Sequence, residues 1–343
     1  MRLSALASAL FGLVLTTSAS VPFVSAQEAP SPGGPPPSSN APGQEPAEDG
    51  PVATLKVKVN LVNVYFSVRD KNGFITNLHK DDCSVEEDKV PQTIKNFTQE
   101  KSLPLTIGIL LDTSGSQQYV LPLEQESGAA FLKDVITPKD EAFLISFDVN
   151  VDLLADYTNS PRELRRAMDK ATINAGVTSG TVTGHGTPRG TLLYDAVYLA
   201  AHDKLRQEAG RKILVLLTDG GDQGSQETLK TATEAAQKAN AIIYVILISD
   251  PQFQGMFSGA GDMDRLAKDT GGRVINVGHD GKRLEAAFMQ IQDELRTQYL
   301  LSYTSTNDKE DGSFRKLQMA CGKDTKVQAR RGYYATGSGG GDD

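Results

Sequence analysis

The chain has 343 residues, of which 39% are hydrophobic, 23% charged and 6% aromatic, so we expect one or two globular domains. This balance excludes a largely disordered chain, a collagen and a protein with several membrane spans. Lys and Arg number 35 against 43 Asp and Glu, which gives a net charge of −8 and argues against nucleic acid as a partner. With 2 cysteines, the chain cannot be a Cys-rich zinc module, an iron–sulfur protein or a disulfide-dense scaffold.

Residues 1–26 have the features of an export signal. Arg2 supplies the basic start, residues 3–18 form an apolar run, and Val24-Ser25-Ala26 offers small residues for cleavage before Gln27. An uncleaved anchor is the alternative, but the run is short for a membrane span and no basic flank follows it. We therefore expect cleavage, a secreted or periplasmic mature chain and no stable membrane anchor.

Residues 27–52 are dominated by Pro, Gly, Ser and acidic residues, and no apolar residue recurs in them with a period. Such a segment buries too little surface to offset its ordering entropy, which predicts a disordered linker rather than a domain. A proline-motif ligand is the alternative. Residues 336–343 are expected to be a flexible tail.

Residues 53–102 form a predicted N-terminal β segment. Apolar residues alternate at 55–61, and the apolar phase then changes at 62–68, which suggests a bulge or a crossing between sheets. Asp70-Lys71-Asn72-Gly73 is a hairpin turn signal, and residues 83–88 and 92–98 are further strand candidates. Because about fifty residues of strands make a marginal domain, this segment needs a partner.

Residues 103–297 alternate between buried strands and amphipathic helices. The apolar runs predicted as strands are 105–111, 142–147, 213–217, 242–248 and, more weakly, 274–277. The predicted helices are 120–136, 161–171, 192–206, 226–240 and 282–296. This alternation predicts an α/β domain built on a doubly wound, mostly parallel sheet.

Residues 298–335 return to strand patterns. The strand candidates are 299–303, 314–319, 327–329 and 333–334, with the polar stretch 307–313 as the expected hairpin loop. Since each flank alone is too small to hold a core, we expect these strands to pair with those of 53–102 in a small β-sandwich.

Oxygen-bearing side chains follow two of the predicted buried strands. The first strand leads into D-T-S-G-S at 112–116, a later one leads into T-D-G at 218–220, and G-T-L-L-Y-D at 190–195 opens a helix between them. Ligands of open α/β sheets bind beyond the carboxyl ends of the strands, and hard oxygen donors suit Mg²⁺ or Mn²⁺. The candidate metal ligands are Asp112, Ser114, Ser116, Thr191 and Asp219.

These three motifs, in this order, resemble the metal-ion-dependent adhesion site (MIDAS) of von Willebrand factor type A (VWFA) domains, and all five donors match it. The flanking strands are similar to those of a bacterial secreted group, the "VWFA-related" proteins first catalogued in acidobacteria. The resemblance covers roughly residues 55–335, in detail for the A domain and more loosely for the flanks.

The resemblance implies that Ser114, Ser116 and Thr191 offer hydroxyls to the metal, with Asp112 and Asp219 contributing directly or through water. One coordination position would remain for a carboxylate of a partner protein. The alternative, from the residues alone, is that Asp112 and Ser114 cap the next helix and Thr191 caps another.

The leading functional hypothesis is therefore an exported, non-enzymatic protein-binding module. One alternative is an envelope structural or assembly component in which the metal only stabilises the loops. A metal-assisted hydrolase is less favoured, because no general base is identifiable near the five ligands. His185, in the Gly- and Thr-rich loop 172–189, either edges the binding surface or is a solvated loop residue.

The two cysteines, Cys83 and Cys321, lie in the two flanking β segments. An exported chain with an even number of cysteines usually oxidises them, so a bond between these two is expected to join the flanks. The alternative is that both are buried free thiols.

Overall fold

The computed structural model describes residues 61–100, 103–173, 190–248 and 259–335. The expected signal, linker and tail, the strand residues before Leu61, and most of the 172–189 loop with His185 lie outside the described residues. Within the described ranges, no helix is long and apolar enough to cross a membrane.

A six-stranded sheet forms the centre of the α/β region, in the order β11-β10-β9-β6-β7-β8. All neighbouring pairs are parallel except β7 and β8, which are antiparallel. If these six strands are numbered 1 to 6 in chain order, from β6 to β11, their order in the sheet, starting at β8, is 3-2-1-4-5-6. The strand order reverses between strands 1 and 4, so the topological switch point lies between β6 and β9. The strands are β6 (Leu105–Asp112), β7 (Glu141–Phe147), β8 (Val151–Thr158), β9 (Arg211–Thr218), β10 (Ala241–Leu247) and β11 (Val274–Asn276).

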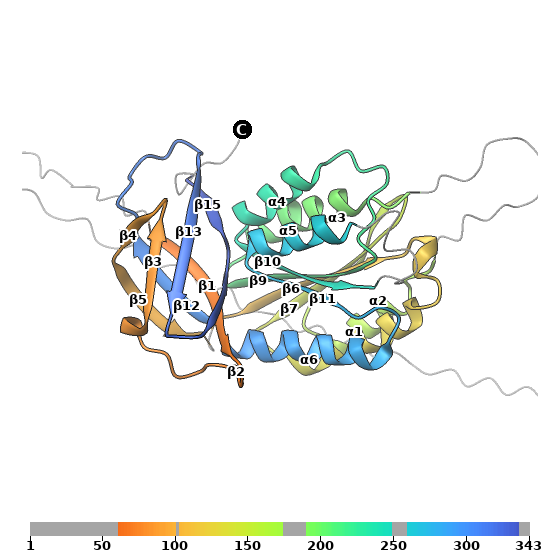
Figure 1. The fold of residues 1–343 in the computed structure, drawn as a ribbon. Coiled ribbons are helices and arrows are strands. Elements are labelled where there is room, and N and C mark those ends of the chain that lie inside the picture. Colours follow the sequence, from red (N-terminus) through yellow and green to blue (C-terminus); the bar gives the residue numbers. More distant parts are fainter. Residues whose placement is uncertain (1–60, 101–102, 174–189, 249–258, 336–343) are drawn as a thin grey trace, which may run out of the picture. The chain divides into compact units, whose positions relative to one another are not determined.

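Helices cover both faces of this sheet (Figure 1). One face packs against α1 (Leu121–Val135), α2 (Pro161–Met168) and α6 (Gly281–Thr297). The other packs against α3 (Leu193–Leu199), which continues as a π-helical turn over Ala200–Leu205, and against α4 (Leu229–Lys238) and α5 (Ala260–Thr270). Because β6, β9 and β10 are buried on both faces, they are almost continuously apolar, as parallel strands usually are.

Strands from before and after the α/β region pair in two antiparallel sheets. One has the order β14-β1-β12-β5 with β2 beside β1, and the other has the order β15-β13-β3-β4. Both sheets contribute to one hydrophobic cluster, in which Phe66, Phe97 and Tyr299 pack ring against ring. The strands are β1 (Leu61–Asp70), β2 (Gly73–Phe74), β3 (Cys83–Glu87), β4 (Val90–Gln92), β5 (Ile94–Gln99), β12 (Tyr299–Thr304), β13 (Phe314–Cys321), β14 (Lys326–Ala329) and β15 (Gly332–Tyr334).

The structure corrects the sequence prediction in three places. The stretch 307–313 is not a hairpin loop, because β12 and β13 belong to different sheets and the stretch carries the chain from one sheet to the other. Strand β8 and helix α5 were not predicted. The predicted turn after β1 is present: Asp70 pairs with Gly73, and its carboxylate accepts hydrogen bonds from the backbone N–H groups of Asn72 and Gly73.

A buried carboxylate, Glu294 on α6, links the flanking strands to the α/β region. Its Oε1 accepts hydrogen bonds from the Ser67 hydroxyl of β1 (3.0 Å), from the Tyr244 hydroxyl of β10 (2.9 Å) and from the Gln328 amide of β14 (2.7 Å). Its Oε2 pairs with the Arg273 guanidinium at 2.9 Å. Burial raises the pKa of Glu294, while Arg273 and the hydroxyl donors act in the opposite direction. The carboxylate thus joins strands from both ends of the chain to the central sheet.

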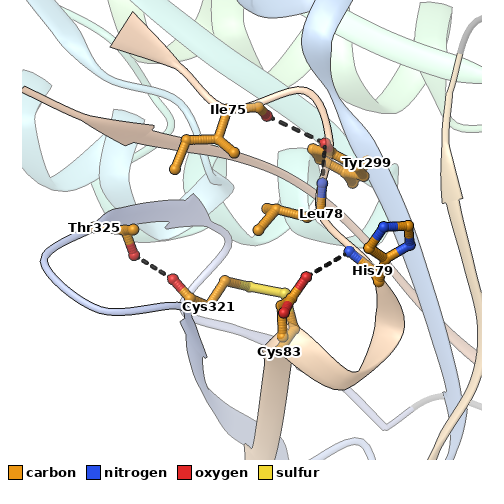
Figure 2. The surroundings of a disulfide bond; sticks show 8 residues. Ile75, Leu78, His79, Cys83, Tyr299, Cys321 and Thr325 are labelled. Carbon is orange, nitrogen blue, oxygen red and sulfur yellow. Dashed lines mark hydrogen bonds between the residues drawn. A yellow bond between two sulfur atoms is a disulfide. The ribbon is translucent and has the colours of Figure 1, made fainter. Parts of the chain in front are cut away.

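A disulfide between Cys83 and Cys321 joins β3 to β13, where the two residues are directly opposite each other in register (Figure 2). Nearby, Tyr299 accepts a hydrogen bond from the Leu78 backbone N–H and donates one to the Ile75 carbonyl, which fixes the chain between β2 and β3 (Figure 2). The bond closes a loop of 238 residues that encloses the whole α/β region. In the chain-entropy model a loop of this length corresponds to roughly 5 kcal/mol of stabilisation, as an upper figure.

Replacing both cysteines by alanine should lower the free energy of unfolding by about 2–5 kcal/mol, because the unfolded chain regains its freedom. Urea denaturation of the wild type and the double variant measures this difference. Thiol titration of the denatured, unreduced wild type should find no free thiol. Two titratable thiols would contradict the bond.

Removing the cation that pairs with Glu294 should leave a buried carboxylate without a counter-ion. Arg273→Ala is expected to lower the free energy of unfolding by about 3 kcal/mol, and adding Glu294→Gln should restore part of the loss. The matched control is Arg283→Ala, which breaks an exposed ion pair with Asp280 and should cost less than about 1 kcal/mol. Equal losses for the two single variants in urea denaturation would argue against a linking role for Glu294.

Candidate metal centre

The candidate centre lies at the carboxyl ends of β6 and β9, on either side of the topological switch point. Asp112 ends β6 and is fully buried. Its Oδ2 accepts a hydrogen bond from the hydroxyl of Thr218, the last residue of β9, at 2.6 Å, and its Oδ1 accepts one from the Ser114 backbone N–H at 3.0 Å. The carboxylate is therefore held from both strands in one orientation.

Ser114 and Ser116 lie on the turn that follows Asp112, and their hydroxyl oxygens are 3.0 Å apart. The turn passes through a short 3₁₀ helix, Gly115–Gln117, and α1 begins only at Leu121 with Val120 as its N-cap. Neither Ser114 nor Val120 makes a side-chain capping hydrogen bond. The alternative that Asp112 and Ser114 serve to cap the next helix is therefore wrong, and the two hydroxyls converge beside the Asp112 carboxylate instead.

Thr191 is paired by its backbone with the loop that carries Asp219. Two hydrogen bonds join Thr191 and Gln223, of 3.0 and 2.9 Å. Helix α3 has Leu192 as its N-cap, without a side-chain hydrogen bond, so the capping alternative is wrong for Thr191 as well. Instead, the Asp222 carboxylate on the loop after β9 accepts a hydrogen bond from a backbone N–H in the first turn of α3, that of Tyr194, at 3.2 Å.

A fourth segment, after β7, connects the other loops. The carbonyl of Asp148 accepts a hydrogen bond from the Leu192 backbone N–H at 2.8 Å, and its carboxylate accepts one from the Thr113 hydroxyl at 3.0 Å. Sequence reasoning missed Asp148 and Asp222 as supports of the site. Both were detectable in principle, since each is an acidic residue within a few positions of the carboxyl end of a buried strand.

Exposure increases from the bottom of the centre to its rim. Asp112 is fully buried and Ser114 nearly so, Thr191 and Asp219 are half-buried, and Ser116 is exposed. Burial raises the pKa of Asp112 to about 7, and the neighbouring Asp219 carboxylate adds to that rise against the hydrogen bonds from Ser114 and Thr218. The negative charges of the two carboxylates thus repel each other, and a cation bound at the switch point would relieve that repulsion.

The donor set fits a small hard cation. Within the described ranges, no three His, Cys, Asp or Glu side chains converge closely enough to hold a metal by themselves. A metal here therefore needs the serine and threonine hydroxyls beside the two carboxylates, and such an all-oxygen set suits Mg²⁺ or Mn²⁺. The structure brings Asp112, Ser114 and Ser116 together directly, and backbone hydrogen bonds join Thr191 to the loop that carries Asp219. The link between Asp219 and Asp112 is electrostatic, since the charge of Asp219 adds to the rise in the pKa of Asp112.

The mostly parallel sheet with helices on both faces confirms the α/β class expected from the sequence, and the three motifs that resemble a MIDAS lie after β6, after β9 and at the start of α3. No protein-family model matches the chain, and no curated protein sequence matches it.

The solved structures to which the chain is similar include three with low sequence identity. BatB from Bacteroides thetaiotaomicron has a TM-score of 0.45 and 16% identity, over 56% of this chain and 99% of that one. The vWF domain of the type V pili tip protein Mfa5 from Porphyromonas gingivalis has a TM-score of 0.44 and 14% identity, over 57% and 96%. Proximal thread matrix protein 1 from the mussel byssus has a TM-score of 0.46 and 14% identity, over 61% and 51%.

Asp112→Asn should abolish Mg²⁺ and Mn²⁺ binding while leaving the fold intact, because the amide keeps the shape of the side chain and removes one of two anionic donors. The loss of affinity should exceed the roughly 100-fold that removal of an outer-shell partner causes. Isothermal titration calorimetry measures the affinity, and the control is Asp152→Asn, on the exposed edge strand β8. Equal metal affinity in wild type and Asp112→Asn would overturn the assignment.

Proposed function

We propose that the protein is an exported, non-enzymatic binding module that holds an acidic group of a partner protein through a divalent cation at its candidate metal centre. The observation that carries the proposal is the graded exposure of the donors, with a buried carboxylate at the bottom and the exposed Ser116 at the rim. Ser114, Ser116 and Thr191 would offer hydroxyl oxygens to Mg²⁺ or Mn²⁺, and Asp112 and Asp219 would supply the anionic donors. When bound, the cation supplies an electrophilic position for an external carboxylate.

The charge of the donor set supports an external anion. Two carboxylates at most balance the charge of a divalent cation, and the other three donors are neutral hydroxyls. The hydrogen bonds that Asp112 already accepts from Thr218 and Ser114 reduce the charge it can donate to a metal. A further carboxylate from a partner would therefore still be attracted, whereas a shell of three or four protein carboxylates would repel it.

An exposed aromatic residue beside the site supports a protein as the partner. Tyr119 follows Ser116 by three residues and is 82% exposed. Tyrosine is among the residues that contribute most at the centres of protein interfaces, since its ring buries a large area at low entropic cost. We infer that Tyr119 contacts the partner next to the metal-bound carboxylate.

Two features support export. The first 26 residues have the pattern of a cleaved signal, and Cys83 and Cys321 form a disulfide, which persists in oxidising compartments and is rare in the cytosol. The mature chain would thus act outside the cytoplasm.

Capture of the partner should require the bound metal and, independently of the metal, the exposed ring of Tyr119. In pull-downs from the native cell envelope, the bound partner should be lost with EDTA, return with excess Mg²⁺, and be displaced by an Asp/Glu peptide but not by its Asn/Gln counterpart. Tyr119→Ala should weaken capture at least about 10-fold with unchanged metal affinity, and Leu153→Ala, another exposed apolar position, is the control.

Other outcomes would support the alternatives. Capture that persists in EDTA, with the chelator lowering only the melting temperature, would indicate a structural or assembly role in which the metal stabilises the loops. Turnover of an ester or phosphoester panel that is lost in Asp112→Asn would indicate a hydrolase.

A further inference from the structure

The first turn of α1 carries a carboxylate in an unusual place. Glu124 is fully buried, and neither of its carboxylate oxygens accepts a hydrogen bond from any group in the described part of the chain. Acidic residues are common in the first turn of a helix, where the helix dipole favours them, but they are normally solvated there. A buried carboxyl group without donors is costly to maintain, so its environment in the functional state must supply donors or positive charge.

A second acceptor without a partner lies on the same segment. Gln117, which directly follows Ser116, is 1% exposed, and its Oε1 also lacks a donor among the described residues. Two backbone hydrogen bonds, from Val120 to Gln117 and from Glu124 to Val120, stack these residues as successive turns. Three buried acceptor oxygens therefore lie on the segment that follows the two candidate serine ligands. Each of them can accept a hydrogen bond from water or interact with a cation.

The charges of two candidate metal ligands act on Glu124. Burial raises the pKa of Glu124 well above its usual value, and the charges of Asp112 and then Asp219 add to the rise. Glu124 is therefore electrostatically coupled to both carboxylates, and more strongly to Asp112 than to Asp219. Because no three His, Cys, Asp or Glu side chains of the described residues form a group that could hold a metal, Glu124 is not counted among the direct ligands.

We propose that Glu124 is a positioning residue of the metal centre, accepting hydrogen bonds from water molecules of the bound cation. This inference rests on the proposed metal function. Water bound to a divalent cation is a strong donor, and ligand-orienting partners of this kind commonly set metal affinity. Gln117 would accept from the same water molecules through Oε1. The cation thus gives the buried carboxylate the donors that it lacks.

The test compares Glu124→Gln with Glu126→Gln, a matched control on the exposed face of the same helix. Calorimetry with Mn²⁺ and with Mg²⁺, and the melting temperature with and without metal, are measured for both variants and the wild type. Glu124→Gln should bind metal 10- to 100-fold more weakly, and its metal-induced rise in melting temperature should shrink accordingly. Its metal-free melting temperature should be unchanged or higher, since an amide beside two carboxylates replaces an acceptor with a donor. Glu126→Gln should match the wild type in every respect.

A variant that keeps both carboxylate oxygens separates the loss of hydrogen-bond acceptors from a change in packing. Glu124→Asp, shorter by one methylene, should bind metal more tightly than Glu124→Gln, and it also serves if the amide variant does not fold. Equal metal affinities for wild type and Glu124→Gln, or an aspartate variant no better than the amide, would overturn this inference while leaving the metal centre intact. A wild type that binds neither Mn²⁺ nor Mg²⁺ would instead overturn the proposed function itself.

Discussion

The hydrogen bond from Thr218 to Asp112 joins the two strands between which the sheet reverses the direction of its connections. At this point the chain leaves β6 toward one face of the sheet and leaves β9 toward the other, so the two loops diverge beyond the strand ends, where open α/β sheets bind their ligands. The Asp112 carboxylate at this point is both buried and fixed by a donor from the neighbouring strand. Every other part of the candidate centre is arranged around it: the serine turn follows Asp112, and the Asp219 loop follows Thr218.

The flanking strands depend on a different constraint, because they come from opposite ends of the described chain. Pairing of β1 with β12 buries aromatic and aliphatic residues of both, and the Cys83–Cys321 bond joins the second sheet at β3 and β13. Glu294 then connects this region to the central sheet through one carboxylate with four donors. Helix α6 bears that carboxylate and leads directly into β12, so the end of the α/β region and the start of the C-terminal strands are held by the same residues.

Sequence reasoning predicted the parts of this fold that burial dictates strongly. Strands buried on both faces, such as β6 and β9, are continuous apolar runs, and the motif residues directly follow them. Strand β8 was missed because it is an antiparallel edge strand with mixed burial, and therefore shows neither an apolar run nor a clean alternation. The role of 307–313 was mistaken because a polar, Gly-containing stretch between two strands has the same composition whether it forms a hairpin or crosses between sheets.

The supporting residues of the centre were harder to predict than the five candidate ligands. Glu124 occupies the first turn of a helix, where an acidic residue ordinarily indicates favourable interaction with the helix dipole and exposure to solvent. Only the packing of α1 against the sheet reveals that this carboxylate is buried, and that the charges of Asp112 and Asp219 help to raise its pKa. Long-range contacts of this kind leave no periodic signal in the sequence.

The central claim is that the oxygen donors at the switch point hold one divalent cation. The most direct measurement is anomalous scattering from a crystal of the protein containing Mn²⁺, recorded at a wavelength that identifies manganese. One strong peak is expected, bounded by Asp112, Ser114, Ser116, Thr191 and Asp219. A well-ordered site without manganese at saturating concentration, or a peak held by other residues, would contradict it.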